Sequence, residues 1–406
     1  MNRLVFSLSL LLTIVLGCSR QEAPEFSHIR RNYLSLEEAK EEVYSLIKDI
    51  DPIITRSGHP GRRVIRSSWT KKLIPGTRAS DNPSADLYIL NFEDSLGFAI
   101  VSSDPTKSIL GLAFSGSLED DNDIDNPGLA ITLANLEAYA RIPTRVDSID
   151  HCEYGPWTNT TYYAPYTGYC PVKWDKGTPS GNQYNAYCPV INGVHCPAGC
   201  VAIAVAQLMS MYCYPSSYGG YSFSWSDMIQ NSSAQNNLGD YYVARLMQQL
   251  GLSQNLDMVY TPYGSGTATQ KIPQTMLNFG YTQGGNHHSF SYSDIQEMKN
   301  HYPIIIDGEP ATGSGHAWLG HGVLIQTREV YWCNEAGEIM LFDGYETREL
   351  ILCNFGWGGI ADGFYSPGGY YTTSGPEVND PNLSTSSTGA YDFPYNIHCV
   401  SGIRVP

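Results

Sequence analysis

Apolar and polar residues follow a helical pattern near the start of the chain. Between Leu36 and Ile50 the apolar side chains recur at intervals of three and four residues, which places them on one face of a helix. Ser35 and Glu38 have the spacing of a capping box, in which each side chain accepts a hydrogen bond from the other residue's backbone N–H group. We therefore predict an amphipathic helix that begins beside Ser35.

Three runs with the length and composition of strands follow this helix. They cover residues 86–92, 97–102 and 109–115, and turn residues separate them. With a short helix expected at 131–140, these runs predict a small α+β module. The stretch from Arg56 to Arg78 contains basic but no acidic residues, and we interpret it as a solvated loop. A processing site and a clamp on an acidic second domain are the alternatives for this stretch.

The composition of the chain changes near residue 150. Residues 1–150 contain 16 of the 24 Lys and Arg residues but four of the 29 Tyr residues, so residues 151–406 are weakly charged and rich in Tyr. This second part is also rich in Gly and Pro, which suits a large domain with many loops. We expect a domain boundary near residue 150, preceded by an exposed linker at 141–145.

The N-terminus has the features of an export signal. Arg3 precedes an apolar run from Leu4 to Leu16, and Gly17 and Cys18 follow it. The run is shorter than the roughly 20 residues that a membrane-spanning helix needs, and the whole segment resembles a bacterial lipoprotein signal. It predicts removal of residues 1–17 and a lipid anchor on Cys18, at the bacterial outer membrane or cell surface, with release after processing left open. The alternative is an ordinary secretory signal with an incidental cysteine.

Charge and cysteine content limit the possible functions. A formal charge of −16 argues against nucleic acid as a partner, because phosphate binding needs clustered basic side chains. Nine cysteines remain when Cys18 is set aside, and an odd number in an exported protein leaves at least one thiol unpaired if the others form intramolecular disulfides. The pairing of those other cysteines stays open.

A candidate nucleophile lies at the start of a buried helix. The residues from Val201 to Met209 are apolar almost all round, and Cys200 precedes them at the first turn. A thiol in this position faces unpaired backbone N–H groups and the positive end of the helix dipole, which stabilises the thiolate and provides donors to an oxyanion. The alternatives are a structural cysteine and a zinc site, the latter formed by Cys188, His195, Cys196 and Cys200 but without the close paired spacings of zinc modules.

A thiolate nucleophile needs a general base, and one histidine has a suitable setting. His316 follows a glycine-rich segment and opens a strand-like run, so its ring can project into a cleft. His321 lies five residues further on, and an odd separation in an extended chain places the two rings on opposite faces. A third segment, 350–359, is a strand that runs into a glycine turn carrying Asn354 and Trp357, whose side chains can orient or shield an imidazole. A structural role is the alternative for His316.

These three segments together resemble the streptopain family of papain-like cysteine peptidases. The resemblance rests on Gly199–Ala202, Gly315–Ala317 and Asn354–Gly359, which occur in the family's order, and it extends to Trp174–Pro179 and Tyr221–Met228. With the strand-like runs of the first module it covers roughly residues 35–406. The resemblance implies an α+β fold with a papain-like two-lobed catalytic domain, a helical lobe and an antiparallel β-sheet lobe, at 151–406. A small inhibitory prodomain and linker at 18–150 would precede it.

The resemblance also implies roles for individual residues. Cys200 would be the nucleophile, His316 the base and acid, Trp357 a neighbour of the imidazole, and Asn354 a candidate for orienting it. Two positions depart from the family's pattern. Lys176 stands where the family has the glutamine of the oxyanion hole, and His321 stands where it tends to have an acidic residue. A lysine is a mobile point charge rather than a fixed amide, so the departure at residue 176 concerns catalytic efficiency.

The sequence therefore predicts a secreted lipoprotein endopeptidase made as a zymogen. Its expected partners are protein or peptide substrates and its own prodomain, and it needs no cofactor or metal. Two rival functions remain: a surface-exposed binding lipoprotein that keeps the papain fold with weakened chemistry, and amide or transglutaminase-type transfer by the same Cys200 and His316.

Overall fold

The computed structural model describes residues 33–406 except 55–62, 74–85, 121–123, 143–150, 167, 176–182, 231–237, 311–313, 334–338 and 374–392. The export signal with Cys18, most of the expected linker, and Lys176 lie outside the described residues. The predictions made for them therefore stay predictions. No helix in the described part of the chain is long and apolar enough to cross a membrane.

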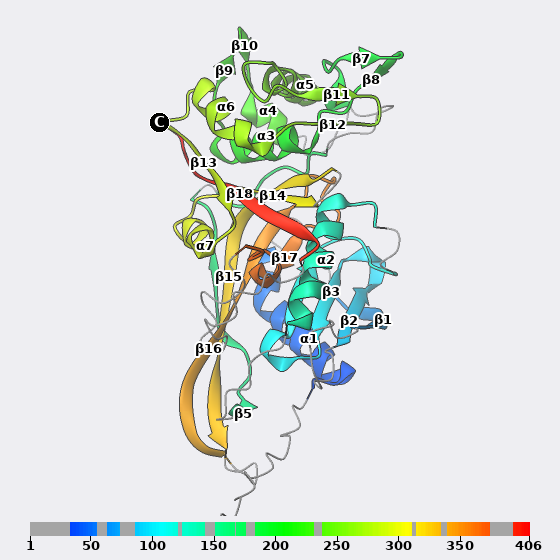
Figure 1. The fold of residues 1–406 in the computed structure, drawn as a ribbon, viewed down its shortest axis with the longest axis vertical. Helices are drawn as coiled ribbons and strands as arrows, with labels where there is room; N and C mark the ends of the chain where they lie inside the picture. Colours follow the sequence, from blue (N-terminus) through cyan, green and yellow to red (C-terminus); the bar gives the residue numbers. More distant parts are fainter. Residues whose placement is uncertain are drawn as a thin grey trace, which may run out of the picture. The chain divides into compact units, whose positions relative to one another are not determined.

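Seven helices and one large sheet form the described fold (Figure 1). The helices are α1 (Leu36–Ile54), α2 (Pro127–Arg141), α3 (Cys200–Tyr212), α4 (Trp225–Gln230), α5 (Leu238–Leu250), α6 (Ile272–Asn278) and α7 (Tyr292–Lys299). The strands of the large sheet are β1 (Ile65–Lys72), β2 (Asp86–Phe92), β3 (Phe98–Ser102), β4 (Ile109–Ala113), β5 (His151–Tyr154), β6 (Thr158–Tyr163), β13 (Gln283–Ser289), β14 (Ile304–Pro310), β15 (His316–Cys333), β16 (Ile339–Asn354), β17 (Gly363–Tyr365) and β18 (Tyr395–Arg404).

Three short hairpins accompany the large sheet. They pair β7 (Val190–Ile191) with β8 (Val194–His195), β9 (Ser217–Tyr218) with β10 (Tyr221–Ser222), and β11 (Val259–Thr261) with β12 (Gly264–Gly266). Figure 1 shows α3 to α6 gathered with these hairpins beside one part of the large sheet, which is antiparallel throughout. The predicted α+β class, with a helical lobe and an antiparallel sheet lobe, is confirmed.

The first module forms largely as its sequence indicates. The capping box is present, since Ser35 N–H donates to Glu38 Oε2 at 2.7 Å and Glu38 N–H donates to Ser35 Oγ at 3.3 Å. The apolar face of α1 is buried against one face of β2, β3 and β4. The other face of these strands belongs to a second core, which includes the apolar side of α2. Both predicted helices of the module and its three predicted strands are therefore confirmed.

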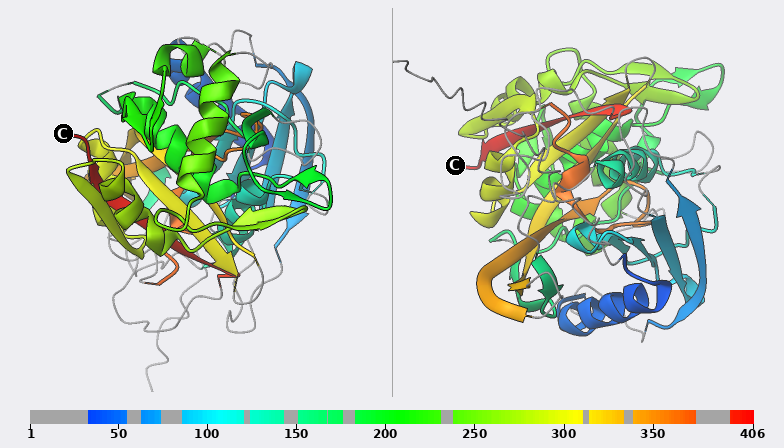
Figure 2. Two further views of the ribbon diagram at one scale, coloured as in Figure 1. Left: turned by 90° about the horizontal axis from the view of Figure 1, so that it is seen from above. Right: turned by 60° about the horizontal axis from the view of Figure 1, so that its bottom comes forward.

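The basic stretch between Arg56 and Arg78 is not simply a solvated loop, and that interpretation was wrong for its centre. Residues 65–72 form β1, which pairs antiparallel with β2 at the edge of the large sheet (Figure 2). Along β1 half-buried and exposed side chains alternate, and the indole N–H of Trp69 donates to Leu118 O at 2.7 Å. Charged side chains on an edge strand discourage pairing with other chains. An edge strand can therefore have the polar composition that is otherwise typical of a solvated loop.

The sheet of the first module is continuous with the sheet of the second part. β4 pairs with β17, with Ala113 opposite Gly363 and Gly111 opposite Tyr365. The strand order runs from β1 to β4, then β17, β16, β15, β14, β18 and β13. Residues 33–406 accordingly form one compact unit. The boundary expected near residue 150 stays a prediction.

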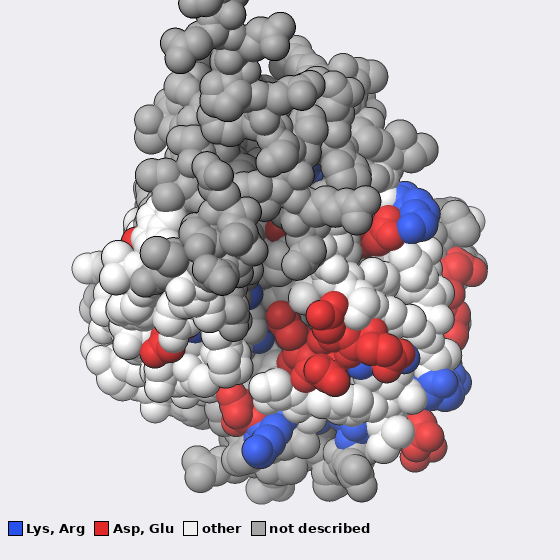
Figure 3. Space-filling model, turned by 90° about the horizontal axis from the view of Figure 1, so that it is seen from below, with Lys and Arg blue, Asp and Glu red and all other residues white. Residues whose placement is uncertain are grey.

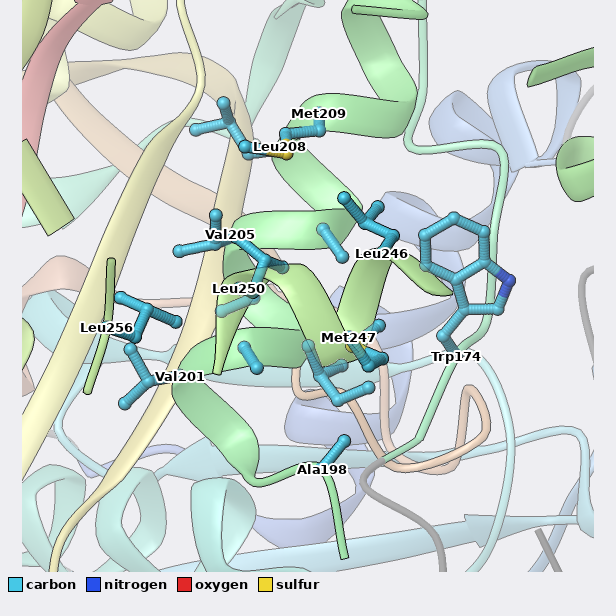
Figure 4. Close-up of a cluster of buried hydrophobic side chains, with 14 of the residues drawn as sticks. Trp174, Ala198, Val201, Val205, Leu208, Met209, Leu246, Met247, Leu250 and Leu256 are labelled. Atoms are coloured by element: carbon cyan, nitrogen blue, oxygen red, sulfur yellow. The ribbon is translucent and has the colours of Figure 1, made fainter. Parts of the chain in front are cut away.

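The helix that carries Cys200 lies in the middle of its own core. Every residue from Val201 to Met211 is buried, and the side chains around it come from α5 and from the segments that carry Trp174 and Leu256 (Figure 4). Full burial of a Val, Leu or Met side chain contributes about 1.5 to 3 kcal/mol. The helix is therefore held from several sides, which gives its first residue a fixed position.

Acidic side chains gather on one face of the described structure (Figure 3). The helix α1 contributes exposed carboxylates from Glu37, Glu38, Glu41 and Asp49.

Candidate active site

The position of Cys200 depends on the glycine before it. Gly199 is the N-cap of α3 and has a φ of +89°. A Cβ at Gly199 would lie 2.5 Å from Met258 Cε and 2.6 Å from the backbone oxygen of Ser265, so another residue would not fit without movement. The glycine lets the chain turn tightly into the helix and leaves Cys200 half-buried as its first residue. The thiol therefore has the helix N-terminus that the sequence predicts.

Cys200 and His316 line the same cleft, whose volume is about 690 Å³. One wall of the cleft is the hairpin β11–β12, and another is the end of β14 with Asp307, Gly308 and Glu309. Pro127, the first residue of α2, also lines the cleft. The predicted nucleophile and base thus share one cavity, and a residue of the first module reaches it.

His316 opens β15 and is buried, with 4% of its surface exposed. Its Nε2 lies 2.8 Å from the backbone oxygen of Phe355, so this nitrogen carries the proton and donates it. The ring is nearly parallel to that of Trp318, with 6.3 Å between the ring centroids. A Cβ at Gly128 of α2 would lie 3.1 Å from His316 Cδ2, which shows how closely α2 approaches the imidazole.

Asn354 is buried, and its described hydrogen bonds go to partners other than His316. Its Nδ2 donates to Val172 O at 3.0 Å, and its Oδ1 accepts from Gln207 Nε2 at 2.9 Å and from Gly356 N–H at 3.1 Å. Asn354 therefore joins α3 to the turn after β16. Trp357 lies half-buried in that same turn.

His321 takes no part in the lining of the cleft. It is buried on another side of β15, where its Nδ1 accepts a hydrogen bond from Cys170 N–H at 3.3 Å. Burial lowers the pKa of His321 to about 3, so its ring is neutral at ordinary pH. The sequence predicts that the rings of His316 and His321 lie on opposite faces of the strand, and this placement agrees with that prediction.

Other thiols in the described part of the chain are poor nucleophiles. Burial raises the pKa of Cys170, Cys188 and Cys353 to about 12. The zinc alternative also lacks support, because Cys188, His195, Cys196 and Cys200 are not among the described groups whose ligand atoms lie within 4.8 Å of one another. Cys200 differs from the buried thiols through its place at a helix start and on the cleft.

Two residues around the site were missed by the sequence reasoning. Gln207 is a polar residue inside the apolar helix α3, and its Nε2 donates to Trp174 O at 3.1 Å as well as to Asn354. A single amide in an otherwise apolar helix was a signal that could have identified it. Asp362 accepts a hydrogen bond from Phe355 N–H at 2.9 Å, and burial raises its pKa to about 7. Nothing in its local sequence indicates this contact.

Comparison with known families gives a match over the region that carries this site. Residues 174–365 match the model described as the Peptidase C10 family. Streptopain from Streptococcus pyogenes is 26% identical over 344 residues, which cover 74% of this chain and 78% of that protein. The thiol protease/hemagglutinin PrtT of Porphyromonas gingivalis is 25% identical over 337 residues, which cover 73% of this chain and 36% of that protein.

A solved structure has the same arrangement of elements. Prointerpain A of Prevotella intermedia superposes with a TM-score of 0.52 at 20% identity, covering 84% of this chain and all of that one. At 20% identity the similarity shows a shared fold and nothing further. It extends over more of the chain than the family model does, so it includes part of the first module.

Proposed function

Because this chain belongs to the streptopain family of cysteine-type peptidases, we propose that it is an exported, lipid-anchored endopeptidase made as a zymogen. In this proposal Cys200 is the nucleophile and His316 is the general base and acid. The observation that carries it is the cleft that these two residues share, with Cys200 at the start of α3.

The proposed reaction is acyl transfer to a thiolate and then to water. The Cys200 thiolate attacks the scissile carbonyl carbon, and the resulting oxyanion accepts a hydrogen bond from the Cys200 N–H at the helix start. His316 gives a proton to the leaving amine, after which the C–N bond breaks and a thioester forms. Water, deprotonated by His316, attacks the thioester and releases the acid. Lys176 is proposed as a second donor to the oxyanion, with the weaker positioning of a flexible cation.

The first module is proposed to hold the enzyme inactive. Two contacts support this role: Pro127 lines the cleft, and Gly128 lies against the ring of His316. The Nε2–H of His316 donates to Phe355 O, which orients the ring and leaves Nδ1 as the unprotonated nitrogen that can serve Cys200. Removal of residues before about 150 would take Pro127 away from the cleft and Gly128 away from the imidazole. Trp357 is proposed to shield the imidazole.

Asn354 has a different kind of support. Its contacts with Val172, Gln207 and Gly356 favour a role in holding the turn after β16 rather than a direct bond to the imidazole. We propose that it positions the Phe355–Trp357 turn, and through it the surroundings of His316.

The lipid anchor on Cys18 and the resulting attachment to a bacterial surface are proposed from the sequence of the first 18 residues. The measurement for this part is membrane fractionation of cells that make the intact chain or Cys18→Ala. The anchored protein should sediment with membranes, and the variant should not. Equal distribution of the two proteins would contradict the anchor.

Casein hydrolysis by Cys200→Ala tests the catalytic proposal. After proteolytic activation the variant should be inactive, because no other described thiol lies on the cleft, whereas Cys213→Ala, which removes an exposed thiol elsewhere, should keep its activity. Retained hydrolysis in Cys200→Ala would show that another group attacks the substrate. A thiol-reactive epoxide separates the peptidase from the binding lipoprotein, since an inactive wild-type protein without labelling of Cys200 would favour the binder. Product analysis with an added amine detects transfer chemistry.

A further inference from the structure

Three side chains on neighbouring strands converge beside the cleft and have no part in the proposed reaction. Asp307 on β14 lies directly opposite His398 on β18, and His287 comes from β13, the next strand of the sheet. Their ligand atoms all lie within 4.8 Å of one another. Ile305 and Val400, two residues away along β14 and β18, pack in the core around α3, so the three side chains share the face of the sheet that α3 covers.

The carboxylate of this group is buried and lacks hydrogen-bond donors. Asp307 is 3% exposed, and neither of its oxygens has a hydrogen-bond partner among the described residues. Its Oδ2 lies 3.3 Å from His287 Nε2, and its Oδ1 lies 3.9 Å from His398 Nδ1, which is itself buried without a hydrogen bond. A buried carboxylate without donors is costly unless a cation neutralises it. The arrangement therefore calls for a positive charge between the three side chains.

We propose that His287, Asp307 and His398 bind a divalent transition-metal ion, for which Zn²⁺ is the natural probe. Two imidazoles and one carboxylate are a common set of three protein ligands for zinc, with the fourth position left open. With zinc–ligand distances of about 2.0 to 2.1 Å, two ligands of a tetrahedral site stand roughly 3.3 to 3.4 Å apart. The separation of 3.3 Å between His287 Nε2 and Asp307 Oδ2 already has this value. His398 Nδ1 lies 3.9 Å from the other carboxylate oxygen, Oδ1, so this imidazole must move about half an ångström closer to the carboxylate when the metal binds.

One existing contact must change when the metal binds. His287 Nε2 also lies 3.1 Å from the hydroxyl oxygen of Thr269, and a metal at Nε2 replaces this hydrogen bond. A second group, His288, Asp294 and Cys399, lies within the same distance limits, but both ring nitrogens of His288 and one carboxylate oxygen of Asp294 have hydrogen-bond partners. There His288 Nε2 lies 3.0 Å from Ser401 Oγ, and Asp294 Oδ2 accepts from Ser291 N–H at 2.8 Å. We therefore restrict the proposal to the first group.

The position of the group gives the metal a function. Asp307 and Thr269 both line the cleft that contains Cys200 and His316. An ion held by Asp307 adds positive charge to the wall of this cleft, and a carbonyl or carboxylate of a bound peptide can reach its open position. In the active enzyme, metal occupancy should change the KM for peptides more than the kcat, because in this proposal the ion binds the peptide while Cys200 and His316 carry the reaction. This effect goes beyond the proposed peptidase chemistry. Metal binding itself can be measured without an assay of peptidase activity.

Titration of the full-length Cys200→Ala protein with Zn²⁺ tests the site. The Cys200→Ala background removes the thiol that lines the cleft, and binding is measured by calorimetry and by competition with a chromophoric chelator. We expect one equivalent to bind in this background. Asp307→Asn and His398→Gln, each added to it, should weaken binding by about tenfold or more, given that even an outer-shell partner of a metal ligand is worth 10- to 100-fold. The matched control is His195→Gln, an exposed histidine on β8 outside the group, which should leave the affinity unchanged.

Two outcomes would overturn the proposal. One is the lack of a zinc-binding equivalent up to millimolar concentration, which would mean that the three side chains do not form a metal site. The other is binding that neither variant weakens, which would place the zinc elsewhere. Circular dichroism of the metal-free variants verifies their folding. His398 is partly exposed, so His398→Gln keeps the test decisive even if Asp307→Asn fails to fold.

Discussion

The contact between α2 and His316 allows a direct test of how the first module acts. Gly128 is the second residue of α2 and has no side chain, which lets the helix approach the catalytic part closely. A Cβ at this position would lie 2.4 Å from Phe355 Cδ1, 3.0 Å from Phe355 Cγ and 3.1 Å from His316 Cδ2. Phe355 is fully buried, so its ring has little room to move away. Gly128→Ala therefore overfills this contact.

The size of the effect follows from two opposing terms. Overfilling a packed contact costs about 1 to 3 kcal/mol. Replacing a helical glycine by alanine stabilises the helix by up to about 1 kcal/mol, and by less in the first turn. The net weakening of α2 docking is about 1 to 2 kcal/mol, which raises the population of the undocked form by roughly 5- to 30-fold.

Labelling of Cys200 in the uncleaved chain reports this population. We expect the thiol-reactive epoxide to modify Gly128→Ala faster than the wild type by a factor in that range, with gel analysis to verify that the chain stays intact. Asp125→Ala, an exposed substitution just before α2, is the control and should change the rate little. Equal labelling rates for Gly128→Ala and the wild type, at equal folded content, would show that α2 docking does not limit access to Cys200.

Two further changes test the surroundings of Cys200 and His316. In the mature enzyme, Asn354→Ala should lower the free energy of unfolding by about 2 to 4 kcal/mol in denaturant titration, because it leaves Val172 O and Gly356 N–H buried without their partner; an unchanged midpoint would contradict the positioning role. Burial raises the pKa of Asp362 from its ordinary value of 3.8 to about 7, so its contribution to stability is fully present below about pH 4 and lost as pH rises through about 7. Asp362→Asn should therefore lessen the decline of stability between pH 4 and 7, and an identical pH profile for both proteins would exclude this carboxyl as its source.

Much of the fold follows from local patterns in the sequence. The capping box at Ser35 and Glu38, the apolar spacing of α1 and the three runs of β2, β3 and β4 all report local interactions, and each element forms where its pattern predicts. The strand β1 was missed because its side chains are polar and charged, as an edge position allows. The joining of β4 to β17 was missed because hydrogen bonding between distant backbone segments leaves no mark on side-chain pattern.

In the candidate site, too, local sequence patterns indicate single residues but not the contacts between distant segments. A helix start and a strand start indicate Cys200 and His316, and the structure brings both to one cleft. The partners of Asn354 come from α3, from Val172 and from its own turn, so its role could not be derived from its neighbours in the chain. The group of His287, Asp307 and His398 is assembled from β13, β14 and β18, and β18 is distant in sequence from the other two strands. The sequence pattern, from which we expect no metal, does not show that these three side chains lie together.

The continuous sheet bears on how the proposed zymogen would be activated. Cleavage in the linker would leave the first module docked, because β4 still pairs with β17 and Ser366 N–H still donates to Leu110 O at 2.8 Å. Each such hydrogen bond contributes about 0.5 to 1.5 kcal/mol net, and the packing of Gly128 adds to them. Activation then requires dissociation as well as cleavage. The edge exposed afterwards, β17, is three residues long, which is short enough to limit pairing with other chains. The strength of module docking, rather than the cut itself, should therefore set the rate at which active enzyme appears.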